Sequence, residues 1–133
     1  MNPPYTFDTN VAVYAFLAEE KSEAAASAIE RSRFMSVQVL NEFASALSRK
    51  HRRSWTDIQE ALVVLTAAVP VIQPIDSQAH SEAMRIAARY QLSFHDALMV
   101  TVALQGGART IYSEDMQHGM IVDDTLRIVD PFR

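Results

Sequence analysis

The stretch SFHDALMVTVALQGGARTIYS, residues 93–113, decides the fold class. Ser93 is a residue type that caps helix N-termini, and the segment Phe94–Gln105 after it is apolar on nearly every face, which predicts a buried helix. Gly106-Gly107 ends this helix, and Arg109–Ser113 has the composition of a strand. A buried helix that leads into a short strand is typical of a sheet covered by helices.

Outward from this stretch, short strands alternate with helices along the chain. The alternation predicts an α/β fold with a parallel sheet that helices cover on both faces. In the fourth helix, spacing predicts a buried stripe of Trp55, Ile58, Leu62, Leu65 and Val69. The other expected strands are Tyr5–Asp8, Phe34–Ser36, Val71–Ile72 and Leu126–Val129, and the other expected helices are Val11–Leu17, Lys21–Arg31, Val37–Lys50, one capped by Ser54 or Thr56 that Pro70 stops, and one capped by Ser77.

Length and composition set the outer limits. The chain has 133 residues, which is the length of one domain, so we expect residues 1–133 to form a single unit. It has no cysteine, which excludes disulfides, thiolate zinc sites and a cysteine nucleophile. The start has neither the basic nor the apolar region of a signal peptide, and no apolar stretch is long enough to span a membrane, so we expect a cytoplasmic protein.

The charge balance narrows the function. Sixteen acidic residues oppose twelve basic ones, giving a net charge of −4. This argues against a protein that coats nucleic acid, which would carry a strong basic excess. It is compatible with an enzyme that holds cations in an acidic site.

Acidic residues occur where an α/β sheet places its sites, beyond the carboxyl ends of the strands. Asp8 closes the first strand, Asp115 follows Arg109–Ser113 by two residues, Glu42 lies in the helix after the second strand, and Asp96 lies in the first turn of the buried helix. Each has an ordinary explanation alone: Asp8 and Asp115 as helix caps, Asp96 as part of a capping box, Glu42 as a solvated residue. Together they suit a hard cation such as Mg²⁺ or Mn²⁺, and hence hydrolysis of a phosphodiester by metal-activated water.

Five short motifs resemble a known family. FDTNV (7–11), NEF (41–43), SFHDAL (93–98), SEDMQHG (113–119) and LRIVDPF (126–132) are similar, in this order, to motifs of the PIN domain, and most to those of the VapC ribonuclease toxins of toxin–antitoxin pairs. The resemblance covers essentially the whole chain. It implies a three-layer α/β/α PIN-like domain with a short, mostly parallel central sheet.

The same resemblance implies a function. It implies a Mg²⁺- or Mn²⁺-dependent endoribonuclease that forms a homodimer, cleaves RNA and is silenced by a VapB-like antitoxin. Asp8, Glu42, Asp96 and Asp115 map onto the acidic quartet of the family, and Thr9, Asn10 and Ser113 onto the polar residues around it. Another PIN-like nuclease or phosphatase that is not a toxin, and a non-catalytic PIN-like binding module, stay open as alternatives.

One dense basic run stands out, formed by Arg49, Lys50, His51, Arg52 and Arg53. An exposed helix end explains it as well as an RNA-backbone contact does, because a cationic helix C-terminus is favourable in itself. We expect Glu114 to lie on the surface and to point away from Asp115.

Overall fold

The central sheet is built from strands that come from both ends of the chain. In the computed structural model, which describes residues 4–17 and 20–133, four strands form a sheet in the order β1-β4-β6-β5. These are β1 (Tyr5–Phe7), β4 (Thr110–Tyr112), β6 (Leu126–Val129) and β5 (Ile121–Val122). β1 pairs with β4 and β4 with β6 in parallel, and only β5 runs antiparallel, so the expected mostly parallel sheet is confirmed.

A second, two-stranded sheet lies beside β1. β2 (Met35–Ser36) and β3 (Ile72–Gln73) pair in parallel, in the register Met35 with Ile72. The segment before β2 is bound to β1, because the Arg33 amide donates to the Tyr5 carbonyl over 2.8 Å and the Thr6 hydroxyl donates to the Phe34 carbonyl over 2.7 Å. The weak strand expected at Phe34–Ser36 is therefore real.

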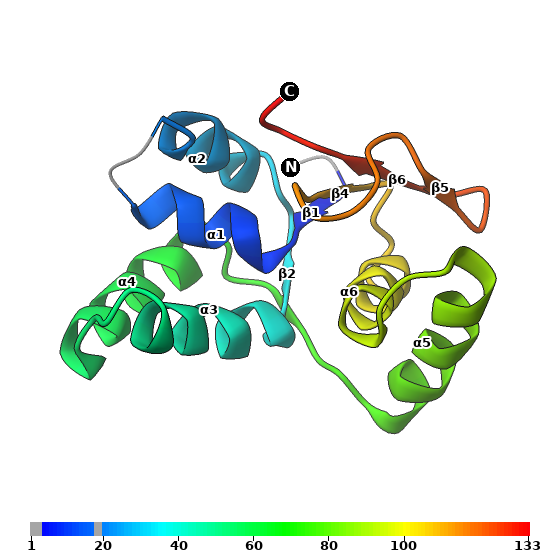
Figure 1. Ribbon diagram of the computed structural model, residues 1–133, viewed down its shortest axis with the longest axis horizontal. Helices are drawn as coiled ribbons and strands as arrows, with labels where there is room; N and C mark the ends of the chain where they lie inside the picture. Colours follow the sequence, from blue (N-terminus) through cyan, green and yellow to red (C-terminus); the bar gives the residue numbers. More distant parts are fainter. Residues whose placement is uncertain (1–3, 18–19) are drawn as a thin grey trace.

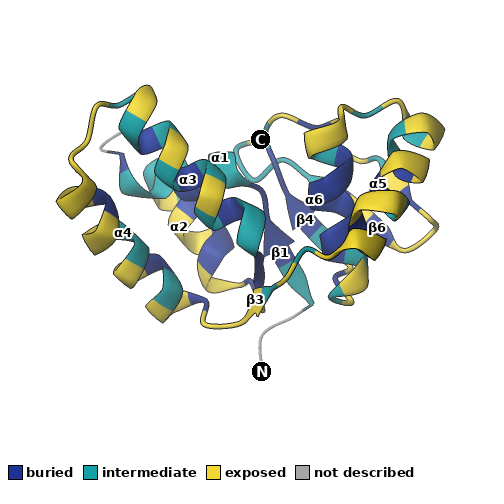
Figure 2. Ribbon diagram, turned by 90° about the horizontal axis from the view of Figure 1, so that it is seen from below, coloured by how far each residue is buried: buried dark blue, intermediate teal, exposed yellow. Residues whose placement is uncertain are grey.

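Helices lie on both sides of the strands. In Figures 1 and 2 alike, α1 to α4 lie on one side of β1, and α5 and α6 lie on the other. The α6 helix is buried along most of its length, from Ala97 to Ala103, as its all-apolar composition predicts. The helices are α1 (Thr9–Phe16), α2 (Ser22–Glu30), α3 (Val37–Arg49), α4 (Trp55–Ala68), α5 (Ser77–Tyr90) and α6 (Phe94–Gln105).

Side-chain caps fix where several helices begin. The Ser54 hydroxyl accepts from the Asp57 amide over 3.1 Å, and the Ser93 hydroxyl accepts from the Asp96 amide over 3.2 Å. The cap of α5 differs from the expected one. Asp76 accepts from the Ala79 amide, and Ser77 is the first helical residue. Both residue types are good caps, so the sequence alone did not separate the two neighbours.

The expected stripe of α4 is only partly correct. Ile58, Leu65 and Val69 are buried, whereas 65% of Trp55 is exposed. Trp55 is the first residue of α4 and directly follows the exposed residues 52–54. Helical spacing gives the face on which a residue lies, but not whether the packed layer reaches the end of the helix.

Close packing explains the glycine after α6. Gly106 has an ordinary helical φ of −80°, so backbone freedom is not the reason for it. A Cβ at this position would lie 2.5 Å from the buried Phe34 ring. The turn thus brings the end of α6 against the segment before β2. In the described part of the chain, no helix is long and apolar enough to cross a membrane.

Candidate active site

Four acidic side chains from four different elements line one cleft. Asp8 follows β1 and caps α1, Glu42 lies within α3, Asp96 lies in the first turn of α6, and Asp115 lies in the loop after β4. The cleft has a volume of about 970 Å³, and Thr9 and Asn10 also line it. The fold therefore brings the predicted acidic residues to one place, as expected for the carboxyl ends of parallel strands.

Asp8 is the most enclosed of the four, with 6% of its surface exposed. Its Oδ1 accepts from the Thr9 amide over 2.8 Å, and its Oδ2 accepts from the Ser113 hydroxyl over 2.8 Å and from the Asn10 amide group over 3.2 Å. The pKa of Asp8 is raised to about 6, chiefly by burial and in smaller part by the charges of Asp96 and Glu42, against the lowering effect of the hydrogen bonds.

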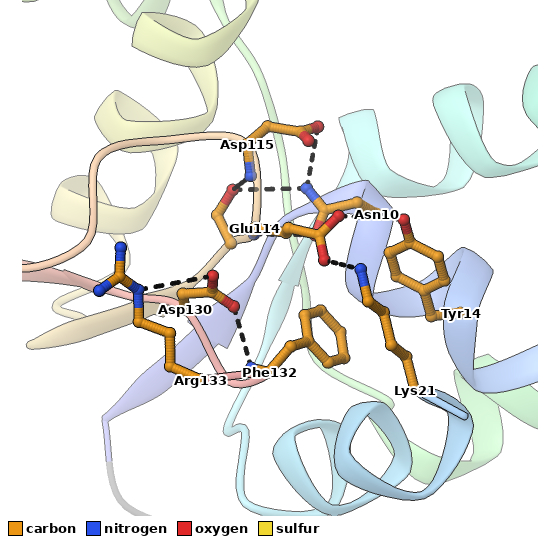
Figure 3. Close-up of polar contacts among 9 residues, drawn as sticks. Asn10, Tyr14, Lys21, Glu114, Asp115, Asp130, Phe132 and Arg133 are labelled. Atoms are coloured by element: carbon orange, nitrogen blue, oxygen red, sulfur yellow. Dashed lines mark hydrogen bonds and ion pairs between the residues drawn. The ribbon is translucent and has the colours of Figure 1, made fainter. Parts of the chain in front are cut away.

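The Asn10 side chain forms hydrogen bonds with residues that follow β1 and β4. Its Nδ2 donates to Asp8 and, over 3.2 Å, to Oδ2 of Asp115, while its Oδ1 accepts from the Glu114 amide over 3.1 Å. Ser113, fully buried, accepts in turn from the Asp115 amide over 3.2 Å. Figure 3 shows Asn10 between the β4 loop and α1, with Asp115 on one side of it. Asn10 and Ser113, two of the three side chains expected around the quartet, thus bind Asp8 directly, and both also bind Asp115.

The other two acids, Glu42 on α3 and Asp96 on α6, have different polar neighbours. The Thr9 hydroxyl donates to Oε1 of Glu42 over 2.8 Å, and Nδ1 of His95 lies 4.0 Å from its Oε2. Burial raises the pKa of Asp96, and the charges of Asp115 and Glu42 add to this against the Ser93 hydrogen bond. Mutual repulsion of this kind is what a bound cation relieves.

The donor set fits a hard divalent cation, because it consists of carboxylate oxygens with hydroxyl and amide oxygens beside them. Within residues 4–17 and 20–133, however, no three His, Asp or Glu side chains lie close enough together to hold one ion. Asp8 and Glu42 are turned toward their hydrogen-bond donors instead. Three of these acids would have to rotate toward one another to share an ion, and Asp115 is the most exposed of the four.

A polar and aromatic cluster beside the cleft was not foreseen from the sequence. Glu114 accepts from the Tyr14 hydroxyl over 3.0 Å and forms an ion pair with Lys21. The Lys21 ammonium lies 4.7 Å from the centre of the Tyr14 ring and 5.3 Å from that of Phe132 (Figure 3). Glu114 does point away from Asp115, as expected, but it is tied to α1 and α2 rather than solvated. Its partners are distant in sequence, so no local pattern signalled them.

Only the first three residues of the basic run, 49–51, line the cleft. Arg49 ends α3 and Lys50 caps it, and both line the cleft together with His51. Arg52 and Arg53 are exposed and lie beyond that lining. The cleft thus has acidic residues over its floor and cations at the end of α3.

Fold and site together define a class: α/β domains with an acidic cleft at the carboxyl ends of parallel strands. The sequence assigns the family, since residues 5–119 match the model of the PIN domain. The chain belongs to the PIN domain family. Among curated proteins, none matches the sequence.

Several solved structures share the fold. A toxin–antitoxin complex from Klebsiella pneumoniae has a TM-score of 0.72 at 17% identity, and the match covers 96% of this chain and 98% of that one. The Mycobacterium tuberculosis toxin VapC20, which cleaves the sarcin–ricin loop, has a TM-score of 0.66 at 18% identity over 84% of this chain and 91% of its own. VapBC2 from Rickettsia felis, bound to a DNA fragment of its promoter, has a TM-score of 0.62 at 16% identity over 84% and 87%. The expected three-layer PIN-like fold is confirmed by these matches.

Proposed function

We propose that this protein is a Mg²⁺- or Mn²⁺-dependent endoribonuclease and the toxin of a VapBC-type toxin–antitoxin pair. The observation that carries the proposal is the meeting of Asp8, Glu42, Asp96 and Asp115, from four elements, in one cleft. Four carboxylates that line one cleft repel one another, and a bound cation would relieve that repulsion. Membership of the PIN domain family supports a nuclease.

The chain's own residues orient the acids. The Asp8 carboxylate accepts hydrogen bonds from Ser113, Asn10 and the Thr9 amide, which hold it in one orientation at the cleft. Asp8, Glu42, Asp96 and Asp115 are the groups that would hold the ion, which supplies a nucleophilic water at neutral pH and stabilises charge on the phosphate. The Thr9 hydroxyl holds Glu42 at the cleft by its hydrogen bond to Oε1. No side chain has to act as a conventional base.

The cations at the end of α3 suit the substrate. Arg49 and Lys50 line the same cleft as the acids, and an RNA strand must place several phosphates near the one that is cleaved. With a net charge of −4, the protein needs such a local positive surface to hold RNA. We therefore assign backbone binding to Arg49 and Lys50, with Arg52 and Arg53 continuing it outward.

The decisive experiment compares wild type with Asp96→Asn on a panel of RNAs, with Mn²⁺ and with EDTA. The variant keeps its helix cap, because the cap uses the backbone amide of Asp96 and not its carboxylate. Asp57→Asn is the matched control, since Asp57 has the same capped position in α4, far from the cleft lining. We expect Mn²⁺-dependent cleavage by wild type and Asp57→Asn, and a loss of at least about a hundredfold in Asp96→Asn. Equal cleavage by all three proteins contradicts the site.

Two further arms address the alternatives. Cleavage of single-stranded DNA or of a simple phosphate monoester, without cleavage of RNA, would indicate the other nuclease or the phosphatase. Metal-independent RNA binding without cleavage would indicate a binding module.

The partner is proposed to be a VapB-like antitoxin. Two of the similar structures are a toxin–antitoxin complex and VapBC2, and an apolar helix with one basic side chain would suit a cleft that is lined by four acids. We expect expression of this protein alone to arrest growth, co-expression of the adjacent small reading frame to restore it, and Asp96→Asn to be harmless. Arrest that persists in Asp96→Asn contradicts a nuclease toxin. Light scattering tests the homodimer that we also propose, and fractionation tests its location in the cytoplasm.

A further inference from the structure

Trp55 is the most unusual surface residue of the protein. It is the only tryptophan of the chain, and 65% of it is exposed. Burial of an aromatic side chain is among the largest stabilising contributions that a residue makes. The exposed Trp55 contributes little of this kind to the stability of the fold. A large exposed aromatic is expected where another molecule covers it.

The position of Trp55 connects it to the cleft. Glu42 and Arg49 lie on the same helix, about 10 Å apart along its axis. Lys50 and His51 continue the cleft lining, the exposed Arg52 and Arg53 follow, and Trp55 begins α4 directly after the Ser54 cap. Acids, cations and an aromatic ring therefore follow one another along a single continuous stretch of backbone.

The turn between α3 and α4 has an arginine at a position where the backbone conformation favours glycine. Arg52 has φ of 52°, in the left-handed region that favours glycine. The turn is closed by the Arg53 amide, which donates to the Leu47 carbonyl over 2.9 Å. The chain thus carries a cationic residue in the left-handed region three positions before Trp55.

Trp55 does not belong to a broader apolar face of α4. The other large exposed apolar residues of this helix are Val63 and Val64. Eight and nine residues along a helix correspond to rotations of about 80° and about 180° from Trp55. A partner helix lying along α4 would not contact all three side chains, whereas a single flat group can cover Trp55 alone.

We propose that Trp55, with Arg52 and Arg53, is a stacking site for an unpaired base of the RNA substrate. The inference rests on the proposed function and adds that the substrate is single-stranded where it leaves the cleft past the end of α3. Aromatic side chains stack on unpaired bases, and arginines beside them add phosphate contacts and cation–π attraction. The bases of a duplex are stacked on each other and cannot reach the indole ring.

The lone tryptophan allows a direct test, because all tryptophan fluorescence comes from Trp55. A short single-stranded RNA is titrated into the Asp96→Asn variant, which does not degrade it, and the same sequence is titrated as a duplex. We expect saturable quenching by the single strand and none by the duplex. Arg52→Gly is expected to raise the melting temperature, since it relieves the left-handed backbone, and yet to weaken the quenching.

Kinetics provide a second readout. With single-stranded RNA and Mn²⁺, Trp55→Ala is expected to raise KM about tenfold at unchanged kcat, and Trp55→Phe to restore most of it. Val63→Ala is the matched control on the same helix. Val63 is 68% exposed, as Trp55 is largely exposed, and its replacement is expected to leave KM unchanged.

The possible outcomes separate this inference from the proposed function. If wild type cleaves RNA while Trp55→Ala has normal KM and Trp55 is not quenched, the stacking site is wrong and the nuclease stands. If wild type neither cleaves nor binds any RNA, both fail. Fluorescence that changes with protein concentration, but not with RNA, overturns the stacking site in favour of a contact between copies of the chain.

Discussion

The Nδ2 atom of Asn10 donates to Oδ2 of Asp115 over 3.2 Å, between residues that are 105 positions apart. The parallel pairing of β1 with β4 brings them together, because each residue lies just past the carboxyl end of its strand. The same amide also binds Asp8, so one neutral side chain lies between two carboxylates that would otherwise repel each other.

Replacing Asn10 by alanine should therefore affect both stability and activity. The change removes donors to Asp8 and Asp115 and the acceptor of the Glu114 amide, so we expect a loss of about 1–3 kcal/mol in the free energy of unfolding. Cleavage of RNA should fall with it. Urea unfolding and initial rates measure the two effects. The exposed Asn41 of α3 is the control, and an Asn41→Ala variant as impaired as Asn10→Ala would show that the bridge is unimportant.

The neighbours Glu114 and Asp115 are expected to behave differently. Asp115 lines the cleft, whereas the carboxylate of Glu114 is bound to Lys21 and Tyr14. Asp115→Asn should abolish most cleavage and leave the fold stable. Glu114→Gln should keep cleavage within a few-fold of wild type and cost about 0.5–1 kcal/mol of stability. Rates and melting curves of both variants decide the matter, and a reversed pattern would assign the fourth acid to Glu114.

The pH dependence of stability should identify Asp8. Its pKa is raised from 3.8 to about 6, so the native state binds this proton more tightly than the unfolded state does. As the pH rises from below about 4 to above about 6, the unfolded chain loses the proton first, and the free energy of unfolding falls by about 3 kcal/mol in all from this group. We expect metal-free wild type to lose stability over this range and Asp8→Asn to lose much less. Urea unfolding at several pH values tests this, and parallel curves for the two proteins would contradict it.

Metal binding should reverse that loss at neutral pH. An ion at a hundredfold excess over its Kd stabilises the native state by about 2.7 kcal/mol, or roughly 8 °C in melting temperature for a chain of this length. Millimolar Mn²⁺ should raise the melting temperature of wild type, and Asp8→Asn should blunt the rise. Asp124→Asn, in the exposed turn before β6, is the control and should respond like wild type. A melting curve that Mn²⁺ does not move would argue against a metal site in this cleft.

Much of the architecture could be predicted from local pattern. The all-apolar segment Phe94–Gln105 and the strand after it gave the buried α6 and β4, because burial on all sides leaves a clear trace in composition. The acids could be placed at one edge since parallel strands fix where their carboxyl ends lie. The two-residue β5 was missed, because so short an antiparallel strand has no periodicity of its own.

What depended on distant contacts could not be predicted. Glu114 finds Lys21, 93 positions away, and nothing near either residue indicates the pair. Trp55 matches the apolar spacing of α4 as well as Ile58 does, yet only Ile58 is buried. The rotation of each acid within the cleft depends on which donor it meets, so the sequence named the residues of the quartet without giving their hydrogen bonds.

The pairing of β1 with β4 has a consequence for how the protein is made. Asp8 is synthesised more than a hundred residues before Ser113, whose hydroxyl donates to its carboxylate, and before Asp115. A nascent chain that stops before β4 has neither the central strand of the sheet nor a complete set of acids. A fragment of this polypeptide that ends before β4 therefore lacks both the strand that pairs with β1 and the fourth acid, so it cannot assemble the acidic cleft.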